Sequence, residues 1–311
     1  MHRKACIYIR CVFCFLIFFT FHNNTFAFFS ALVVQSINVE PYNKAFEGIK
    51  SSYGNNLKRI IICTYKGDIK EYIEKKKPHI IFAIGEWALS KVLSIKKIPI
   101  VYLMVLNPHP FLSVNKNISG VSMLVSPQKR FEYIKKHIPH AKRIGVIYNP
   151  KNSAYIYKEL FKAAKKNQMS LVAKKVFSSK DVIDAIKEIS DNIDLFFMLP
   201  DATVISPESL SFMNLFFLKK SIPIVTFSEK YLKLGAFMAI YSDPFDMGFQ
   251  AGTLAKKIIK GKVKPPVVVW PKARFKINPY VAKNLGLKID KKKRISPDEN
   301  NEKNKRISFN N

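Results

Sequence analysis

The sequence predicts an α/β protein made of two modules, each a doubly wound and mostly parallel sheet. Apolar runs alternate along the chain with stretches of helical periodicity, as in a series of βα units. The runs are apolar throughout, which is typical of strands that helices cover on both faces. The alternation occurs twice, before and after a looser stretch that ends at Gly120. A chain of 311 residues with 48% hydrophobic residues is long enough to bury a core in both modules.

Four apolar runs mark the strands of the first series, and periodic stretches between them mark its helices. Because parallel strands need crossover helices between them, this order predicts a parallel sheet covered on both faces. The predicted elements are strand Leu32–Ile37, helix Tyr42–Tyr53, strand Arg59–Cys63, helix Asp68–Lys76, strand Ile80–Ile84, a helix from Trp87, and strand Pro99–Val105.

The second series repeats the pattern and begins with a helix. Its predicted elements are helix Pro127–His137, strand Arg143–Tyr148, helix Ser153–Asn167, strand Ser170–Val176, helix Ser179–Ser190, strand Leu195–Leu199, helix Pro207–Lys219 and strand Pro223–Val225. A closing segment follows, and from the sequence it can complete either module. It consists of the run Gly235–Tyr241, helix Phe245–Lys260, and strands Pro266–Trp270 and Arg274–Ile277.

The amino terminus has the features of a secretory signal peptide. Arg3, Lys4 and Arg10 precede an uncharged run from Cys11 to Phe21, and Thr25 and Ala27 stand at the −3 and −1 positions of a cleavage site. The run is too short for a permanent membrane span, so we expect residues 1–27 to be removed, with an uncleaved anchor as the alternative. No small residues precede Cys11 or Cys14, which argues against a lipoprotein.

Three of the four cysteines lie in this amino-terminal segment, which leaves Cys63 alone in the mature chain. No disulfide is therefore expected. Cys63 ends the apolar run 60–63, so we expect a buried structural thiol there. At the other end of the chain, residues 288–311 are polar and basic and predict a disordered tail.

The excess of basic residues suggests nucleic-acid binding, but the predominance of lysine over arginine argues against it. The chain has 52 basic and 22 acidic residues, a formal net charge of +30, but only eight of the basic residues are arginines. Recognition of bases and phosphates favours the planar guanidinium group, and the lysines are spread through every predicted helix. We therefore expect no nucleic-acid partner.

Motifs for catalysis, metals and dinucleotides are missing. No H-E-x-x-H, Cys-x-x-Cys, Walker loop or G-x-S-x-G pattern occurs, and no metal or cofactor is expected. The turn after the first strand reads Asn38-Val39-Glu40-Pro41 instead of a glycine-rich loop, which excludes a dinucleotide site of the usual kind. His109 is the only histidine at a strand end, and we expect it in a loop without a functional role.

Polar and aromatic residues gather in the loops that follow the predicted strands. In open α/β sheets ligands bind outside the carboxyl ends of the strands, where helix amino termini offer free N–H groups. Helix capping explains each loop taken singly, whereas seven such loops together favour a site for a small zwitterion. The loops are 38–42, 85–87, 106–108, 148–153, 199–203, 227–229 and 241–244. In the first module the candidate ligand contacts are Glu40, Tyr42, Glu86, Trp87 and Asn107.

Several short motifs agree in order and spacing with one known family. The motifs are Ile118-Ser119-Gly120-Val121-Ser122, the run from Pro139 to Pro150, Phe227-Ser228-Glu229, Gly235-Ala236, and the helix with Gly248-Phe249-Gln250-Ala251-Gly252. Over residues 32–287 the chain resembles the periplasmic substrate-binding proteins of ABC transporters, of the tryptophan or aromatic amino-acid-binding type.

The resemblance implies the type I periplasmic binding protein architecture, with two Rossmann-like lobes that are joined by three hinge crossovers and close on a ligand. It implies an amino-terminal lobe of residues 28–116 plus 240–264 and a carboxy-terminal lobe of residues 117–239 plus 265–287. The first lobe differs from the family pattern at Glu86 and Trp87, where relatives have small residues, and at Asn107, where they have Asp. In the second lobe the family's ligand contacts match Tyr148, Asn149, Ser153, Asp201, Thr203, Phe227 and Ser228.

The leading hypothesis is a monomeric solute receptor in the periplasm, with peripheral association of its lysines with the inner membrane as an open alternative. It binds a small amino-acid-like molecule between its lobes and delivers it to an ABC permease. A second hypothesis keeps the ligand site but assigns the docking partner to a membrane receptor kinase. A third is an enzyme that uses Asp201 or Glu86 as a base, which the missing motifs disfavour.

Overall fold

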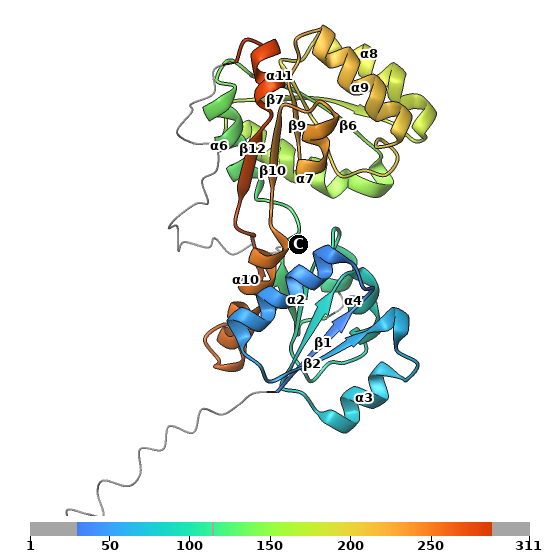
Figure 1. Ribbon diagram of the computed structural model, residues 1–311, viewed down its shortest axis with the longest axis vertical. Coiled ribbons are helices and arrows are strands. Elements are labelled where there is room, and N and C mark those ends of the chain that lie inside the picture. Colours follow the sequence, from blue (N-terminus) through green and yellow to red (C-terminus); the bar gives the residue numbers. More distant parts are fainter. Residues whose placement is uncertain (1–29, 114, 288–311) are drawn as a thin grey trace, which may run out of the picture.

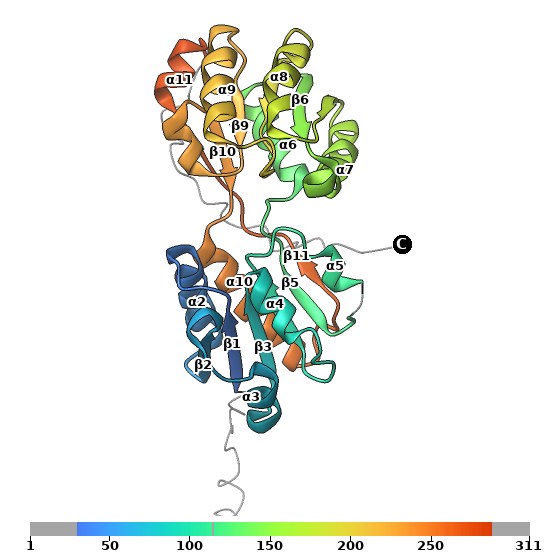
Figure 2. The ribbon, with the colours of Figure 1, turned by 90° about the vertical axis from the view of Figure 1, so that its right-hand side faces the viewer.

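The computed structural model describes residues 30–113 and 115–287, which form two α/β lobes, one above the other in Figures 1 and 2. The predicted signal peptide, residues 1–27, and the predicted tail, residues 288–311, lie outside the described residues. Within the described part, none of the helices combines the length and apolar character needed to cross a membrane. The α/β class with two parallel-dominated sheets is confirmed.

The first sheet has six parallel strands in the order β11-β5-β4-β3-β1-β2. Its strands are β1 (Ala31–Gln35), β2 (Leu57–Ile61), β3 (Ile80–Ile84), β4 (Ile100–Leu103), β5 (Ile118–Val121) and β11 (Val268–Val269). Its helices are α2 (Glu40–Tyr53), α3 (Ile69–Lys76), α4 (Glu86–Val92), α5 (His109–Leu112) and α10 (Pro244–Ile259), and the 3-10 turn η1 is Ile62–Thr64.

The second sheet repeats this strand order as β12-β10-β9-β8-β6-β7, with β12 antiparallel to β10. Its strands are β6 (Arg143–Tyr148), β7 (Ser170–Lys175), β8 (Leu195–Phe197), β9 (Ile224–Thr226), β10 (Met238–Tyr241) and β12 (Arg274–Ile277). Its helices are α6 (Pro127–His137), α7 (Pro150–Lys166), α8 (Val182–Ser190), α9 (Pro207–Lys219) and α11 (Pro279–Asn284), with 3-10 turns η2 (Ser179–Asp181) and η3 (Glu229–Leu234).

Each sheet is buried on both faces, as its uniformly apolar strands predict. In the first lobe, α2 and α10 cover one face and α3 and α4 the other. In the second lobe, α6, α7 and α11 cover one face and α8 and α9 the other. The side chains of strand β3 are fully buried along its whole length, which explains why its sequence has no alternating pattern.

The chain passes between the lobes three times, at residues 122–126, 242–243 and 270–273 (Figure 2). Strands β5 and β11 pair with each other in the first sheet, whereas the lobe ranges expected from the sequence placed both in the second lobe. Strand β10 belongs to the second sheet throughout, although its last residues were expected in the first lobe. The short strand β5 lies in the stretch that the sequence pattern left unassigned, because its four residues include Ser119 and Gly120.

After strand β10 the chain leaves the second sheet, and helix α10 packs closely on α2 of the first lobe. A Cβ at Gly248 would lie 1.9 Å from the backbone oxygen of Ala45, and one at Gly48 would lie 2.1 Å from that of Phe245. No side chain fits at either position, so the two helix backbones touch directly. This contact fixes the segment that follows the second crossover to the first lobe.

The prediction for Cys63 was wrong, because the thiol is exposed. Strand β2 starts and ends two residues earlier than predicted, with its last pair at Gln35 and Ile61. Beyond that pair the chain turns into η1, and β2 is an edge strand of the sheet, so residue 63 lies outside the covered part of the sheet and is exposed among the described residues. His109, expected in a loop, begins the short helix α5.

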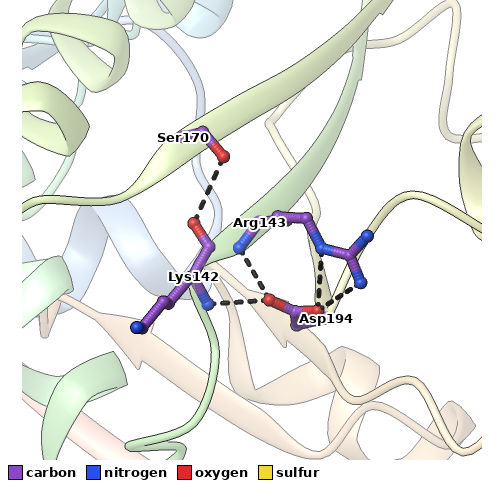
Figure 3. A network of polar contacts seen from close by, with 4 residues as sticks. All are labelled: Lys142, Arg143, Ser170 and Asp194. Atoms are coloured by element: carbon purple, nitrogen blue, oxygen red, sulfur yellow. Dashed lines mark hydrogen bonds and ion pairs between the residues drawn. The ribbon is translucent and has the colours of Figure 1, made fainter.

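At the pole of the second lobe opposite the crossovers, Asp194 ties the starts of two strands together (Figure 3). One carboxylate oxygen accepts hydrogen bonds from the backbone N–H groups of Lys142 and Arg143, both at 2.8 Å. The other accepts from Arg143 Nε at 3.1 Å and Nη2 at 2.8 Å. Burial would raise the pKa of Asp194, but these hydrogen bonds and the charge of Arg143 outweigh it and lower the pKa.

We expect Asp194→Asn to lower the free energy of unfolding at pH 7 by about 1–2 kcal/mol, because the amide loses charge-assisted hydrogen bonds. A lowered folded-state pKa contributes stability above the unfolded value of about 3.9, and the contribution is lost as the pH falls below it. The difference between the two proteins should therefore shrink in acid. Urea unfolding at pH 7 and below pH 4 measures it. Asp191→Asn, at an exposed ion pair with Lys220, is the control and should change little. An equal effect of both substitutions would contradict the assignment.

Candidate functional site

The carboxyl ends of both sheets point toward the opposite lobe. Strand β5 runs directly into the first crossover, and β10 runs directly into the second. All other strands of the first sheet are parallel to β5, and β6 to β9 are parallel to β10, so their carboxyl ends lie at the same inter-lobe edges. In each sheet the strand order reverses between two central strands, β1 and β3 in the first and β6 and β8 in the second. Ligands of such sheets bind at these switch points.

Polar contacts already join the lobes at these edges. The Tyr155 hydroxyl, on α7 of the second lobe, donates a hydrogen bond to the Leu106 carbonyl of the first lobe. The Tyr155 ring also meets the His109 ring edge-on, with centroids 5.3 Å apart. At the crossovers, Ser242 Oγ donates to the Met123 carbonyl at 2.8 Å. Sequence reasoning missed Tyr155, which sits inside a helix and past the predicted loop.

In the second lobe, the Asp201 carboxylate organises the switch-point loops. Asp201 is 1% exposed. Oδ2 accepts hydrogen bonds from the Asn149 backbone N–H at 2.7 Å and from the Ser153 hydroxyl. Oδ1 accepts from Asn152 Nδ2 at 3.1 Å and from the Thr203 backbone N–H at 2.9 Å. Through these four hydrogen bonds, the Asp201 carboxylate holds the loop at 149–153 and the loop at 201–203 together.

Four of the predicted second-lobe residues, Asn149, Ser153, Asp201 and Thr203, therefore meet in one network. Asn149 also caps α7 by accepting from Lys151 N and donates from Nδ2 to Thr203 Oγ1 at 2.9 Å. Ser153 lies at a kink in α7, with a non-helical backbone, which is why the helix begins at Pro150, before the predicted start. Asn152, outside the predicted set, is exposed and donates to the same threonine hydroxyl at 3.0 Å.

The aromatic residues predicted for the second lobe are used largely in packing. The ring of Tyr148 is 4% exposed and stacks on Tyr157, with centroids 4.5 Å apart. Phe227 is half-buried and contacts the Tyr231 ring edge-on at 5.4 Å. Ser228 precedes η3 and forms no side-chain capping bond. Phe227 and Ser228 thus keep part of their surface at the edge, whereas Tyr148 belongs mainly to the core.

The first-lobe candidates fall into an outer and an inner group. Glu40 is outer: its side chain is 77% exposed and pairs with Lys44 at 2.7 Å on the surface of α2. Tyr42 is inner and half-buried against Gly85, where an added Cβ would lie 2.8 Å from its ring. Ser36 completes this contact by donating to the Ile84 carbonyl and accepting from Ala88 N.

Glu86 and Trp87 form the first turn of α4 at the first switch point, and both are exposed. Burial raises the pKa of Tyr42, and the negative charge of Glu86 raises it further. Burial also raises the pKa of Tyr155, where Glu86 acts in the same direction and Arg130 in the opposite one. The charge of Glu86 therefore raises the pKa of one tyrosine in each lobe, Tyr42 in the first and Tyr155 in the second. Asn107 lies on the same edge, and its buried Oδ1 has no hydrogen-bond partner among the described residues.

The arrangement is suited to binding a small polar molecule. Each edge combines aromatic rings with amide, hydroxyl and carboxylate groups. Among the described residues, no group of three or more histidine, cysteine or acidic side chains is placed to hold a metal ion.

Comparison with known proteins gives the family and two partial sequence relatives. A family model described as ABC transporter substrate binding protein matches residues 58–300. The chain is 32% identical over 191 residues to a tyrosine-binding protein of Clostridioides difficile (strain R20291), covering 59% of this chain and 55% of that protein. It is 27% identical over 147 residues to the uncharacterized protein RP367 of Rickettsia prowazekii (strain Madrid E), which covers 47% of this chain and 48% of that protein. The chain spans about half the length of the curated relatives it matches.

Solved structures share the fold at lower identity. The ligand-free, open structure of CD0873, a substrate-binding protein with adhesive properties from Clostridium difficile, matches with a TM-score of 0.70 and 23% identity, over 86% of this chain and 98% of that one. A Streptococcus pneumonia ABC domain in complex with L-Trp matches with a TM-score of 0.57 and 18% identity, over 85% of this chain and 96% of that one. Because the family model covers most of the sequence and these neighbours share the two-sheet architecture, the chain belongs to the ABC transporter substrate-binding proteins and has the type I periplasmic binding protein fold.

Proposed function

We propose that the protein is an extracytoplasmic receptor that binds an amino acid with an aromatic side chain between its lobes for uptake by an ABC permease. The observation that carries the proposal is the pair of switch-point edges that face each other across three crossovers. A ligand held by both edges links two lobes that otherwise touch at few points, so binding favours the closed form. The relatives named for tyrosine binding and for a complex with L-Trp support the choice of ligand class.

The contacts that we propose come from both edges. The first lobe supplies Tyr42, Glu86, Trp87 and Asn107, where the Glu86 carboxylate suits an ammonium group and the exposed Trp87 ring suits an aromatic one. The second lobe supplies Asn149, Thr203, Phe227 and Ser228, while Ser153 and Asp201 hold the loops in place. Tyr148 contributes mainly through packing. We leave Glu40 out because Lys44 already engages its carboxylate.

Secretion to the periplasm by cleavage after Ala27 is part of the proposal, as is docking of the closed form on a permease. The family is extracytoplasmic, and the sequence of residues 1–27 has the three regions of a signal peptide. A sensor that docks on a membrane receptor kinase would use the same ligand site and differ only in this partner.

We expect L-tyrosine or L-tryptophan to raise the thermal stability of the protein, by about 2.7 kcal/mol at a concentration 100 times the Kd.

Glu86→Gln should weaken binding about 10-fold in isothermal titration calorimetry, because a charge-assisted contact to the ammonium group is lost. Glu40→Gln is the matched control, since it removes a carboxylate from the same lobe without affecting the proposed contacts. If no amino acid stabilises the protein, or if both substitutions weaken binding equally, this ligand assignment is wrong.

We expect Asp201→Ala to lower the free energy of unfolding by about 3 kcal/mol, because the four groups that donate hydrogen bonds to the carboxylate lose their acceptor. Ligand affinity should fall as well, since the loops that carry Asn149 and Thr203 are no longer held. Urea unfolding and calorimetry of the same sample measure the two effects. Asp184→Ala, on the surface of α8, should leave both unchanged. A stable Asp201→Ala protein would show that the carboxylate does not organise this edge.

A further inference from the structure

Arg130 is a buried arginine without an acidic partner. It lies in the first turn of α6 and is 3% exposed. Among the described residues, no carboxylate forms an ion pair with its guanidinium group and no acceptor forms a hydrogen bond with it. Its contacts are the ring of Phe197, 5.7 Å from the guanidinium carbon, and the electrostatic interaction with Tyr155. An arginine this deeply buried is rare in proteins unless it is paired.

Arg130 is nearly closed off from solvent, so its guanidinium group keeps at most slight contact with water. Buried polar side-chain atoms that lack any partner occur in the described residues at Tyr102, Asn107 and Asn214, and no nitrogen of Arg130 is among them. Burial lowers the pKa of Arg130, because desolvation disfavours its charged form. The side chain is thus a buried cation whose guanidinium donors have no acceptor among the described residues.

Its position in the fold places this cation at the inter-lobe edge. Helix α6 starts immediately after the first crossover, so its first turn lies at the same end of the lobe as the strand tips. Phe197 is the last residue of β8, one of the two switch-point strands. Tyr155 reaches from α7 to the Leu106 carbonyl of the first lobe. Both neighbours of Arg130 therefore belong to the edge that faces the first lobe.

We propose that Arg130 binds the carboxylate of the ligand; this inference rests on the proposed function and names the group that orients the amino acid. Glu86 of the first lobe also interacts electrostatically with Tyr155, with the charge opposite to that of Arg130. A zwitterion between the lobes then places its ammonium group near Glu86 and its carboxylate at Arg130. The planar guanidinium group offers two parallel N–H donors to a carboxylate, which a lysine cannot do.

The experiment compares L-tyrosine and L-tryptophan with their carboxamides, L-tyrosinamide and L-tryptophanamide, which keep the ring and the ammonium group but lose the negative charge. Calorimetry measures each affinity for the wild type and for Arg130→Met, Arg130→Lys and Lys129→Met. Lys129→Met is the matched control, because it removes a positive charge from the same turn of α6 at a residue that is less buried. Unfolding without ligand checks that each variant is folded.

We expect the wild type to prefer the acid over the amide by about 10- to 100-fold, and Arg130→Met to lose this preference while its affinity for the amide stays the same. Arg130→Lys should keep part of the preference, and Lys129→Met all of it. If the wild type binds the acid and the amide equally, the inference is overturned even if Arg130→Met does not fold. If Arg130→Met keeps the preference, the inference fails and the proposed function stands. If no wild-type ligand in the panel binds, the proposed function fails as well.

Discussion

The architecture depends on one constraint, that the first lobe is completed by segments from the second half of the chain. Strand β11, close to the carboxyl terminus, pairs with β5 of the first sheet, and helix α10 leaves the second sheet to pack on α2. The chain must therefore cross between the lobes three times. Because β5 and β10 lead straight into crossovers, their carboxyl ends face the opposite lobe, and the parallel pairing extends this orientation across both sheets. The position of the site follows from connectivity.

The two edges are prepared differently for a ligand. In the second lobe, the buried Asp201 carboxylate holds two loops through bonds to backbone N–H groups, so the geometry of this edge is fixed before anything binds. In the first lobe, Glu86 and Trp87 project from the start of a short helix and are exposed. The second-lobe edge is thus held by a buried hydrogen-bond network, whereas the first-lobe edge presents exposed side chains. Under the proposed function, this difference favours initial docking of the ligand on the second lobe, followed by contacts with Glu86 and Trp87 of the first.

The fold was predictable from the sequence because its strands are buried on both faces, and continuous apolar runs such as 80–84 and 143–148 match the observed strands. Short or polar elements gave no such signal: β5 contains Ser119 and Gly120, and β2 is an edge strand, which misplaced Cys63. Sheet membership of β11 depends on pairing over 148 residues, as in the bond from Val267 N to Ser119, and no local pattern encodes it. For the candidate site, loop composition singled out Asn149, Asp201 and Thr203, which the structure joins in one hydrogen-bond network, but gave no signal for Arg130 or Tyr155. Both lie within helices, where their roles depend on which side of the lobe each helix turn faces.

The pairing of β11 with β5 also determines when the first lobe can form. Residues 268–269 are needed to complete its sheet, and α10, which covers one face, ends only at Ile259. During synthesis the first half of the chain therefore emerges without the parts that finish its core. Contacts that span so much sequence slow folding, since a large loop must close before they form. The first lobe consequently cannot complete its sheet until residues 268–269 have left the ribosome.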